Sequence, residues 1–216
     1  MVIIGAGGLA KEILATLLWT RPDADVALFD DVSPSSPPEL LGFPVLRTWE
    51  ELQAHWRRAG TETVIGVGAS AARQMLGARI VAAGGRLGTL ISNHALVAGF
   101  GVTVAEGVCI LPYAMVMPDV SIGAGCLVNK GASLSHDTTI GRYCSIAPGA
   151  RILGGASVGD GAEIGANATV LPRVKVGAGS RVGAGAVVFK DVADGATVVG
   201  NPAEPIGAAL RRRRRG

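Results

Sequence analysis

The second half of the sequence carries an aliphatic residue at every sixth position without interruption. The series has fifteen members: Val104, Ile110, Val116, Ile122, Val128, Leu134, Ile140, Ile146, Ile152, Val158, Ile164, Val170, Val176, Val182 and Val188. Four positions after each of them stands a small or β-branched residue, and three positions after each stands Gly, Asp or Asn in twelve of the fifteen cases. A period of this length indicates a repeat architecture.

The hexads predict a parallel β-helix with three short faces per coil. The aliphatic residue would fill the interior, the small residue would fit the corner, and Gly, Asp or Asn would accept the positive φ of a tight turn. Eighteen residues make one coil, so the fifteen hexads make five coils stacked about 4.8 Å apart. Cys126 and Cys144 are eighteen positions apart and should stack in one corner as free thiols, because disulfides are rare in the cytoplasm. We assign residues 93–206 to this domain.

The first ninety residues show a different pattern. Apolar runs predict strands at 2–4, 26–29 and 63–67, and helical spacing predicts helices after Ala10, at 49–59 and at 71–83. Prolines 34, 37 and 38 mark a loop. Alternating strands and helices indicate a small parallel α/β domain over residues 1–92.

A glycine-rich turn joins the first strand of this domain to the first helix. Gly5, Gly7 and Ala10 fit the G-x-G-x-x-G/A spacing of a dinucleotide-binding turn, and Asp30 follows about twenty residues later. The domain offers room for one nucleotide only, which counts against an NAD-dependent enzyme. A turn that needs glycine only for backbone clearance is the alternative. If the turn binds phosphate, a sugar-linked nucleoside diphosphate is the natural ligand.

The amino-acid composition restricts the classes of partner that the protein can bind. The net charge of +3 depends on five arginines at 211–215, and without them the count is 15 basic against 17 acidic residues. The folded body is therefore not a basic nucleic-acid binder, and residues 207–216 are expected to form a disordered Arg-rich tail. No apolar run approaches the roughly 20 residues of a membrane span, and no signal peptide is recognised, so we expect a cytoplasmic protein.

The whole pattern resembles the sugar O-/N-acyltransferase family, which includes sialic acid O-acetyltransferases and UDP-4-amino-sugar and GDP-perosamine N-acetyltransferases. The resemblance implies a half-Rossmann domain followed by a left-handed β-helix, a homotrimer, and acetyl-CoA as co-substrate. The motifs that carry it are Ile3-Ile4-Gly5-Ala6-Gly7-Gly8, Phe29-Asp30-Asp31, Gly42-Phe43-Pro44-Val45, Asn129-Lys130-Gly131-Ala132, Ser135-His136-Asp137 and Gly200-Asn201-Pro202-Ala203.

The family chemistry needs a base that removes a proton from a sugar amine or hydroxyl. His136 is the candidate, because an imidazole is near half-protonated at cytoplasmic pH. Asp137 would orient the ring and raise its basicity. The alternative interpretation is a solvated histidine beside an ordinary turn aspartate. By resemblance, Asn129 should face the acceptor sugar.

The resemblance also implies contacts with acetyl-CoA. Ser145 stands where many relatives carry a second histidine, and its hydroxyl can still donate to the thioester oxygen. Backbone amides around Gly154, Ala166 and Ala184 should line the CoA groove, with simple turn packing as the alternative.

In the small domain, Gly7, Gly8 and Leu9 are expected to bind the diphosphate through backbone amides. Asp30 and Asp31 would accept hydrogen bonds from the base or ribose. Gly68 would let the nucleotide approach the backbone. UDP is favoured over GDP because Asp30-Asp31 resembles the UDP-sugar branch.

We therefore expect an acetyltransferase acting on the amino or hydroxyl group of a nucleotide-linked sugar, most simply a UDP-4-amino-sugar. A sialic acid or other sugar O-acetyltransferase is the alternative enzyme, and a sugar-nucleotide-binding scaffold is the non-enzymatic alternative. A zinc site like that of γ-class carbonic anhydrases would need three histidines. The spacing of His55, His94 and His136 does not bring them together, so no metal is expected.

Overall fold

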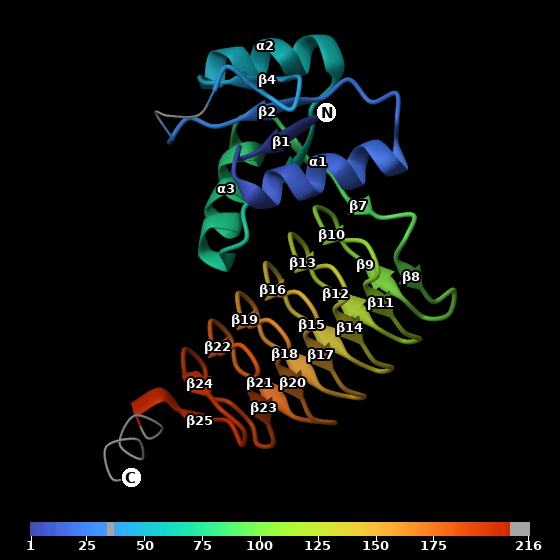
Figure 1. The fold of residues 1–216 in the computed structure, drawn as a ribbon, viewed down its shortest axis with the longest axis vertical. Coiled ribbons are helices and arrows are strands. Elements are labelled where there is room, and N and C mark those ends of the chain that lie inside the picture. Colours follow the sequence, from blue (N-terminus) through green and yellow to red (C-terminus); the bar gives the residue numbers. More distant parts are fainter. Residues whose placement is uncertain (34–36, 208–216) are drawn as a thin grey trace.

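The computed structural model describes residues 1–33 and 37–207, which form an α/β domain seated on one end of a long prism (Figure 1). The loop residue Pro34 and most of the Arg-rich tail, residues 208–216, lie outside the described residues. Within the described part, no helix is long and apolar enough to cross a bilayer.

The α/β domain is built on a six-stranded sheet with the order β3-β4-β2-β1-β5-β6. All neighbours are parallel except β3 and β4. The strands are β1 (Val2–Ile4), β2 (Ala27–Phe29), β3 (Glu39–Leu40), β4 (Phe43–Leu46), β5 (Glu62–Ile65) and β6 (Arg86–Leu87), and the helices are α1 (Gly8–Thr20), α2 (Trp49–Ala59) and α3 (Ser70–Ala82).

The sequence predicted three of these strands and missed the other three. β3 and β6 have only two residues each, and β4 contains Pro44, so none of them shows a periodic apolar pattern. The helices follow their local signals more closely. α2 is capped by Thr48, whose hydroxyl accepts a hydrogen bond from the Glu51 amide at 3.2 Å in a capping box.

The prism has three parallel sheets, which we call face 1, face 2 and face 3. Face 1 contains β7 (Leu90–Ile91), β10 (Cys109–Ile110), β13 (Leu127–Val128), β16 (Ser145–Ile146), β19 (Glu163–Ile164), β22 (Arg181–Val182), β24 (Thr197–Val199) and the antiparallel β25 (Glu204–Pro205). Face 2 contains β8 (Leu96–Val97), β11 (Met115–Val116), β14 (Ser133–Leu134), β17 (Arg151–Ile152), β20 (Thr169–Val170) and β23 (Val187–Val188). Face 3 contains β9 (Thr103–Val104), β12 (Ser121–Ile122), β15 (Thr139–Ile140), β18 (Ser157–Val158) and β21 (Lys175–Val176).

The hexad positions take the places that the period predicted. From Ile110 to Val188 every inward aliphatic residue is at most 3 % exposed, and Val104 is half-buried. Burying one such side chain stabilises the fold by roughly 1.5–3 kcal/mol. Fourteen of the fifteen turn positions have φ between +53° and +70°, the exception being Asp191. Tyr113, Tyr143 and Arg173 are among them, so even bulky residues adopt this conformation when the stack requires it.

Successive coils are joined by backbone hydrogen bonds in fixed register. Val128 pairs with Ile146, eighteen positions later, whereas Ile91 pairs with Ile110, nineteen positions later. The extra residue lies between Val97 and Val104, where the sequence period is also irregular. Cys126 and Cys144 are both free and buried, and the Cys144 amide donates to the Cys126 sulfur at 3.3 Å.

Candidate active site

A cavity of about 490 Å³ opens beside the ends of β1, β2 and β5. It brings together five of the residues expected to bind the nucleotide, which are Gly7, Gly8, Leu9, Asp30 and Asp31. The sixth, Gly68, is adjacent, because a Cβ atom placed on it would lie 3.7 Å from the Leu9 side chain. The glycine turn and the two aspartates therefore share one hollow.

The glycine turn combines close packing with an uncapped helix end. Gly5 has φ +105°, and a Cβ atom on Gly66 would lie 2.8 Å from the Ile4 carbonyl oxygen, so the two loops need glycine to approach. α1 starts after Gly7 without a side-chain cap and without an acidic residue in its first turn. The N–H groups of its first turn point out of the N-terminal end of the helix, where the helix dipole favours an anion.

The two aspartates are held differently. One oxygen of Asp30 accepts hydrogen bonds from the amides of Val32 and Ser33, at 3.1 and 3.0 Å. Asp31 accepts a hydrogen bond from the Trp49 indole at 2.9 Å and forms an ion pair with Arg79 at 3.1 Å. The Arg79 guanidinium also stacks over the Trp49 ring, 4.2 Å from its centre. Neither Trp49 nor Arg79 belongs to a local motif, so the sequence alone did not indicate them.

His136 and Asp137 lie at the edge between face 2 and face 3, in the turn after β14. The His136 Nδ1 atom is 2.7 Å from a carboxylate oxygen of Asp137, and 68 % and 63 % of the two side chains are exposed. Asp137 has φ +61°, which is the turn geometry that its hexad position demands. One residue thus serves both the turn and the imidazole contact.

Gly154 occupies the next coil below the imidazole. A Cβ atom on Gly154 would lie 2.6 Å from both Cε1 and Nε2 of His136, well inside contact distance. The absence of a side chain at this position leaves room for the ring. The sequence analysis had assigned Gly154 only a backbone amide in the CoA groove.

The remaining expected residues lie elsewhere on the prism. Asn129, Ala166 and Ala184 follow strands of face 1 and lie at the edge between face 1 and face 2. Asn129 is buried, and its side-chain oxygen accepts a hydrogen bond from the Lys130 amide at 2.8 Å. Ser145 lies on face 1 itself. Within one chain, the expected acetyl-transfer residues other than Ser145 are therefore divided between the two edges of face 2.

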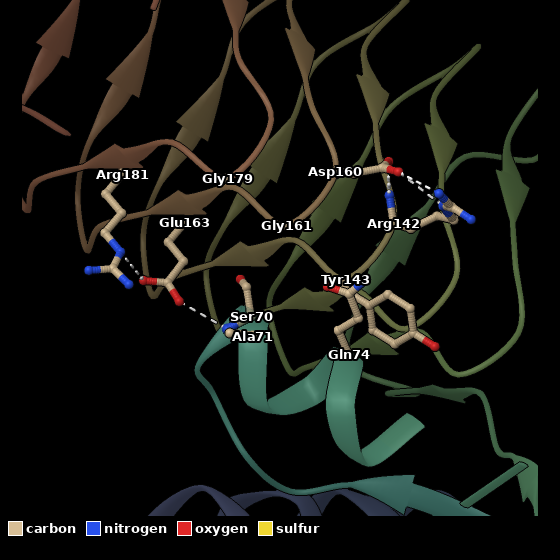
Figure 2. Close-up of a pocket in the computed structure, with 10 residues that line it drawn as sticks. All are labelled: Ser70, Ala71, Gln74, Arg142, Tyr143, Asp160, Gly161, Glu163, Gly179 and Arg181. Carbon is tan, nitrogen blue, oxygen red and sulfur yellow. Dashed lines mark hydrogen bonds and ion pairs between the residues drawn. The ribbon is translucent and has the colours of Figure 1, made fainter. Parts of the chain in front are cut away.

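A second hollow, of about 270 Å³, lies where α3 meets face 1 (Figure 2). Its two arginines are engaged, Arg142 with Asp160 at 2.9 Å and Arg181 with Glu163 at 3.5 Å. The Arg142 amide, and then its guanidinium, hold the pKa of Asp160 below its ordinary value. None of the expected site residues lines this hollow, which we interpret as a junction between the domains.

The other two histidines lie apart from His136. His55 is buried in α2, and this burial lowers its pKa, while His94 packs against Trp19 and Tyr113. Among residues 1–33 and 37–207, no group of three His, Cys, Asp or Glu side chains has the arrangement to hold a metal ion.

Family models match both parts of the chain. The description "Bacterial transferase hexapeptide (six repeats)" covers residues 122–154 and 155–190, and "PglD N-terminal domain" covers residues 1–80. A comparison with curated proteins found no match.

Solved structures match nearly the whole chain. A mutant of perosamine N-acetyltransferase from Caulobacter crescentus, in complex with CoA and GDP-perosamine, is 32 % identical with a TM-score of 0.87, covering 94 % of this chain and 95 % of that one. The acetyltransferase domain of PglB from Neisseria gonorrhoeae FA1090 in complex with acetyl coenzyme A is 29 % identical, with a TM-score of 0.87 and coverages of 94 % and 97 %. WeeI from Acinetobacter baumannii AYE is 29 % identical, with a TM-score of 0.86 and coverages of 94 % and 98 %.

The chain belongs to the left-handed β-helix family of sugar acyltransferases. The half-Rossmann domain and the hexapeptide prism predicted from the sequence are both confirmed. The resemblance to sugar N-acetyltransferases covers the α/β domain and the prism together, so it applies to both halves of the candidate site.

The close packing of Gly154 against His136 leads to a prediction. Gly154→Ala should displace the imidazole and lengthen its contact with Asp137, because the new methyl group occupies the space of the ring. The ring signals of His136 in an NMR spectrum should shift. Gly99→Ala is the matched control, since nothing lies within 4 Å of the Cβ position of Gly99. Unchanged His136 signals in Gly154→Ala would contradict this account.

Proposed function

We propose that this acyltransferase moves the acetyl group of acetyl-CoA to the amino group of a UDP-linked 4-amino sugar. The observation that supports it most directly is the His136–Asp137 pair, which lies in an uninterrupted hexapeptide stack with space kept free by Gly154. PerB from Caulobacter crescentus forms a complex with CoA and GDP-perosamine.

In this proposal His136 is the general base. Its Nδ1–H donates a hydrogen bond to the Asp137 carboxylate, which leaves the Nε2 lone pair to accept a proton from the sugar ammonium or from the attacking amine. The amine nitrogen forms a bond to the thioester carbonyl carbon, and the carbon–sulfur bond breaks. The proton that His136 took from the amine passes to the leaving sulfur, so CoA leaves as a thiol, the imidazole is neutral again, and charge and atoms balance.

The α/β cavity is the proposed site of the nucleotide. The uncapped N-terminus of α1, with Gly7, Gly8 and Leu9, suits the diphosphate. Asp30 and Asp31 supply acceptors for N–H and O–H groups of the base or ribose, and Gly68 leaves the backbone accessible. UDP remains our preferred nucleotide from the Asp30-Asp31 motif, although the ligand named for the Caulobacter relative is GDP-perosamine.

The proposed acetyl-CoA groove requires two copies of the chain. Gly154 lies at one edge of face 2, whereas Ala166 and Ala184 lie at the other. A closed ring of three prisms, each turning face 2 inward, would bring one edge of each copy to the opposite edge of the next. Asn129 and Ser145 would then approach the His136 of a second copy.

The outward side chains of the prism support this choice of face. Near the α/β domain, face 2 exposes apolar residues, while face 3 carries only polar outward residues along its strands. The exposed apolar residues of face 2 are Leu96, Met115 and Met117. The polar outward residues of the face 3 strands are Thr103, Ser121, Thr139, Ser157 and Lys175. Contiguous exposed apolar side chains are typical of an interface.

The role of His136 can be tested with a thiol-release assay. His136→Ala should lower kcat by roughly 10²–10⁴-fold, the usual contribution of a general base, with little change in acetyl-CoA affinity. Asp137→Asn should lower kcat less, because the amide oxygen no longer carries the charge that stabilises the imidazolium. His94→Ala, which removes another exposed imidazole, is the control. Near-normal turnover of His136→Ala would refute the role.

Calorimetry with UDP, GDP, dTDP and NAD tests the acceptor site. UDP should bind most tightly, and Asp31→Asn should weaken it roughly tenfold, or about 1.4 kcal/mol. The asparagine oxygen can still accept the Trp49 indole hydrogen bond, so the cavity should keep its shape. Asp23→Asn, an exposed carboxyl of the same domain, should bind UDP normally. Tighter binding of GDP than of UDP would make GDP the assigned nucleotide. Binding of NAD alone would overturn the assignment of this cavity to a sugar nucleotide.

The assembly can be tested by light scattering. The wild-type protein should have the mass of three chains. Met115→Glu should reduce that mass, because three carboxylates would be buried around one axis. Thr139→Glu places the same charge on the outward side of face 3 and should leave the trimer intact. A wild-type monomer at micromolar concentration would contradict the proposal.

A further inference from the structure

One side of α3 rests on the prism through three residues spaced at helical intervals. The Ser70 amide donates a hydrogen bond to Glu163 at 2.9 Å (Figure 2). Gly77 packs against the Tyr143 ring, where a Cβ atom would lie 2.6 Å from the hydroxyl oxygen. Arg73 lies between them in the sequence and is fully buried. Because residues 70, 73 and 77 share one helical face, α3 connects the α/β domain directly to face 1.

Arg73 reaches both domains with a single guanidinium. On one side Nη1 donates to the carbonyl oxygens of Ile65 and Val67, each at 2.9 Å. On the other side Nε donates to the carbonyl of Gly125 at 2.8 Å, and Nη2 approaches that of Cys126 at 3.4 Å. Ile65 and Val67 flank Gly66 in the loop after β5, whereas Gly125 and Cys126 form a corner of the prism.

The chemistry of this contact requires arginine. Its planar fork presents N–H donors in two directions, while a lysine ammonium is a point charge with three donors. No carboxylate pairs with Arg73 among the described residues, and four backbone carbonyl groups accept its hydrogen bonds. A buried cation in such an environment is costly unless its hydrogen bonds are satisfied.

The loop that Arg73 holds is part of the nucleotide cavity. Gly66 and Val67 line this cavity, and Gly68 lies against Leu9 of the glycine turn. We propose that Arg73 is a positioning residue, which fixes this loop relative to the prism and thereby sets the affinity for the nucleotide-linked acceptor. The effect of Arg73 on acceptor affinity rests on the proposed function, whereas its effect on the position of the loop does not.

The experiment compares Arg73→Met, Arg73→Lys and a control of similar stability loss. Val158→Ala is that control, because it removes buried volume from the prism far from α3 in the sequence and on another face. Each protein is examined by thermal unfolding, by calorimetry with UDP and with acetyl-CoA, and by hydrogen exchange of the amides of residues 65–69. If Arg73→Met is insoluble, Arg73→Lys carries the test with a smaller effect.

Arg73→Met should weaken UDP binding about tenfold or more and speed exchange in the loop, while acetyl-CoA affinity changes by less than about twofold. Val158→Ala should lower the Tm without either effect. Equal losses of both ligands, or UDP binding no weaker than in Val158→Ala, would overturn the proposal. If the wild-type protein binds no nucleoside diphosphate, the proposed function fails, and unchanged exchange of residues 65–69 would separately refute the role of Arg73.

Discussion

The backbone hydrogen bonds between successive coils are the constraint on which the rest of the structure depends. From β9 to β20 each strand pairs with the strand eighteen positions later, so side chains eighteen apart stand in columns. An inward position must then be filled by an aliphatic residue in every coil, and almost every turn must accept a positive φ. The same register determines which residues meet on the outside. It brings the His136 imidazole directly against Gly154 and the Cys144 amide against the Cys126 sulfur.

The three faces of the prism differ because their outward residues are free of this constraint. Face 1 is apolar where Leu90, Cys109 and Leu127 pack under the α/β domain. Face 3 carries small or polar residues along its whole length. Face 2 has exposed apolar residues at one end and the expected acetyl-transfer residues along its two edges. A regular interior thus supports three surfaces with different uses.

The sequence predicted those structural features that depend on residues close together in the chain. The hexads gave the prism and its turns, and apolar spacing predicted α2 at the bounds observed, because Thr48 and Glu51 cap it locally. The contact between His136 and Asp137 also followed from adjacency. By contrast, β3 and β6 have two residues each and are too short to show a pattern, and β6 also depends on pairing with β5, twenty-four positions earlier.

The same reasoning explains which parts of the candidate site were missed. Asp31 was identified from a motif, but its partners Trp49 and Arg79 come from other elements and follow only from the packing of the domain. Arg73 was still harder to identify from the sequence, because a single arginine in a predicted helix resembles a surface residue. Only the fold reveals that prism carbonyls lie within its reach.

The hydrogen-bond partners of Arg73 at the junction between the two domains matter for a reaction that depends on proton transfer. If His136 acts as a base, its charge changes during each cycle, and the distance between acceptor and base should not vary with that charge. A guanidinium does not lose its proton in proteins, and backbone carbonyls do not titrate, so the Arg73 contacts persist at any pH at which the protein is folded. The neighbouring hydrogen bond from the Ser70 amide is made instead to the Glu163 carboxylate. The Arg73 contacts therefore keep the two domains aligned independently of the charge on His136.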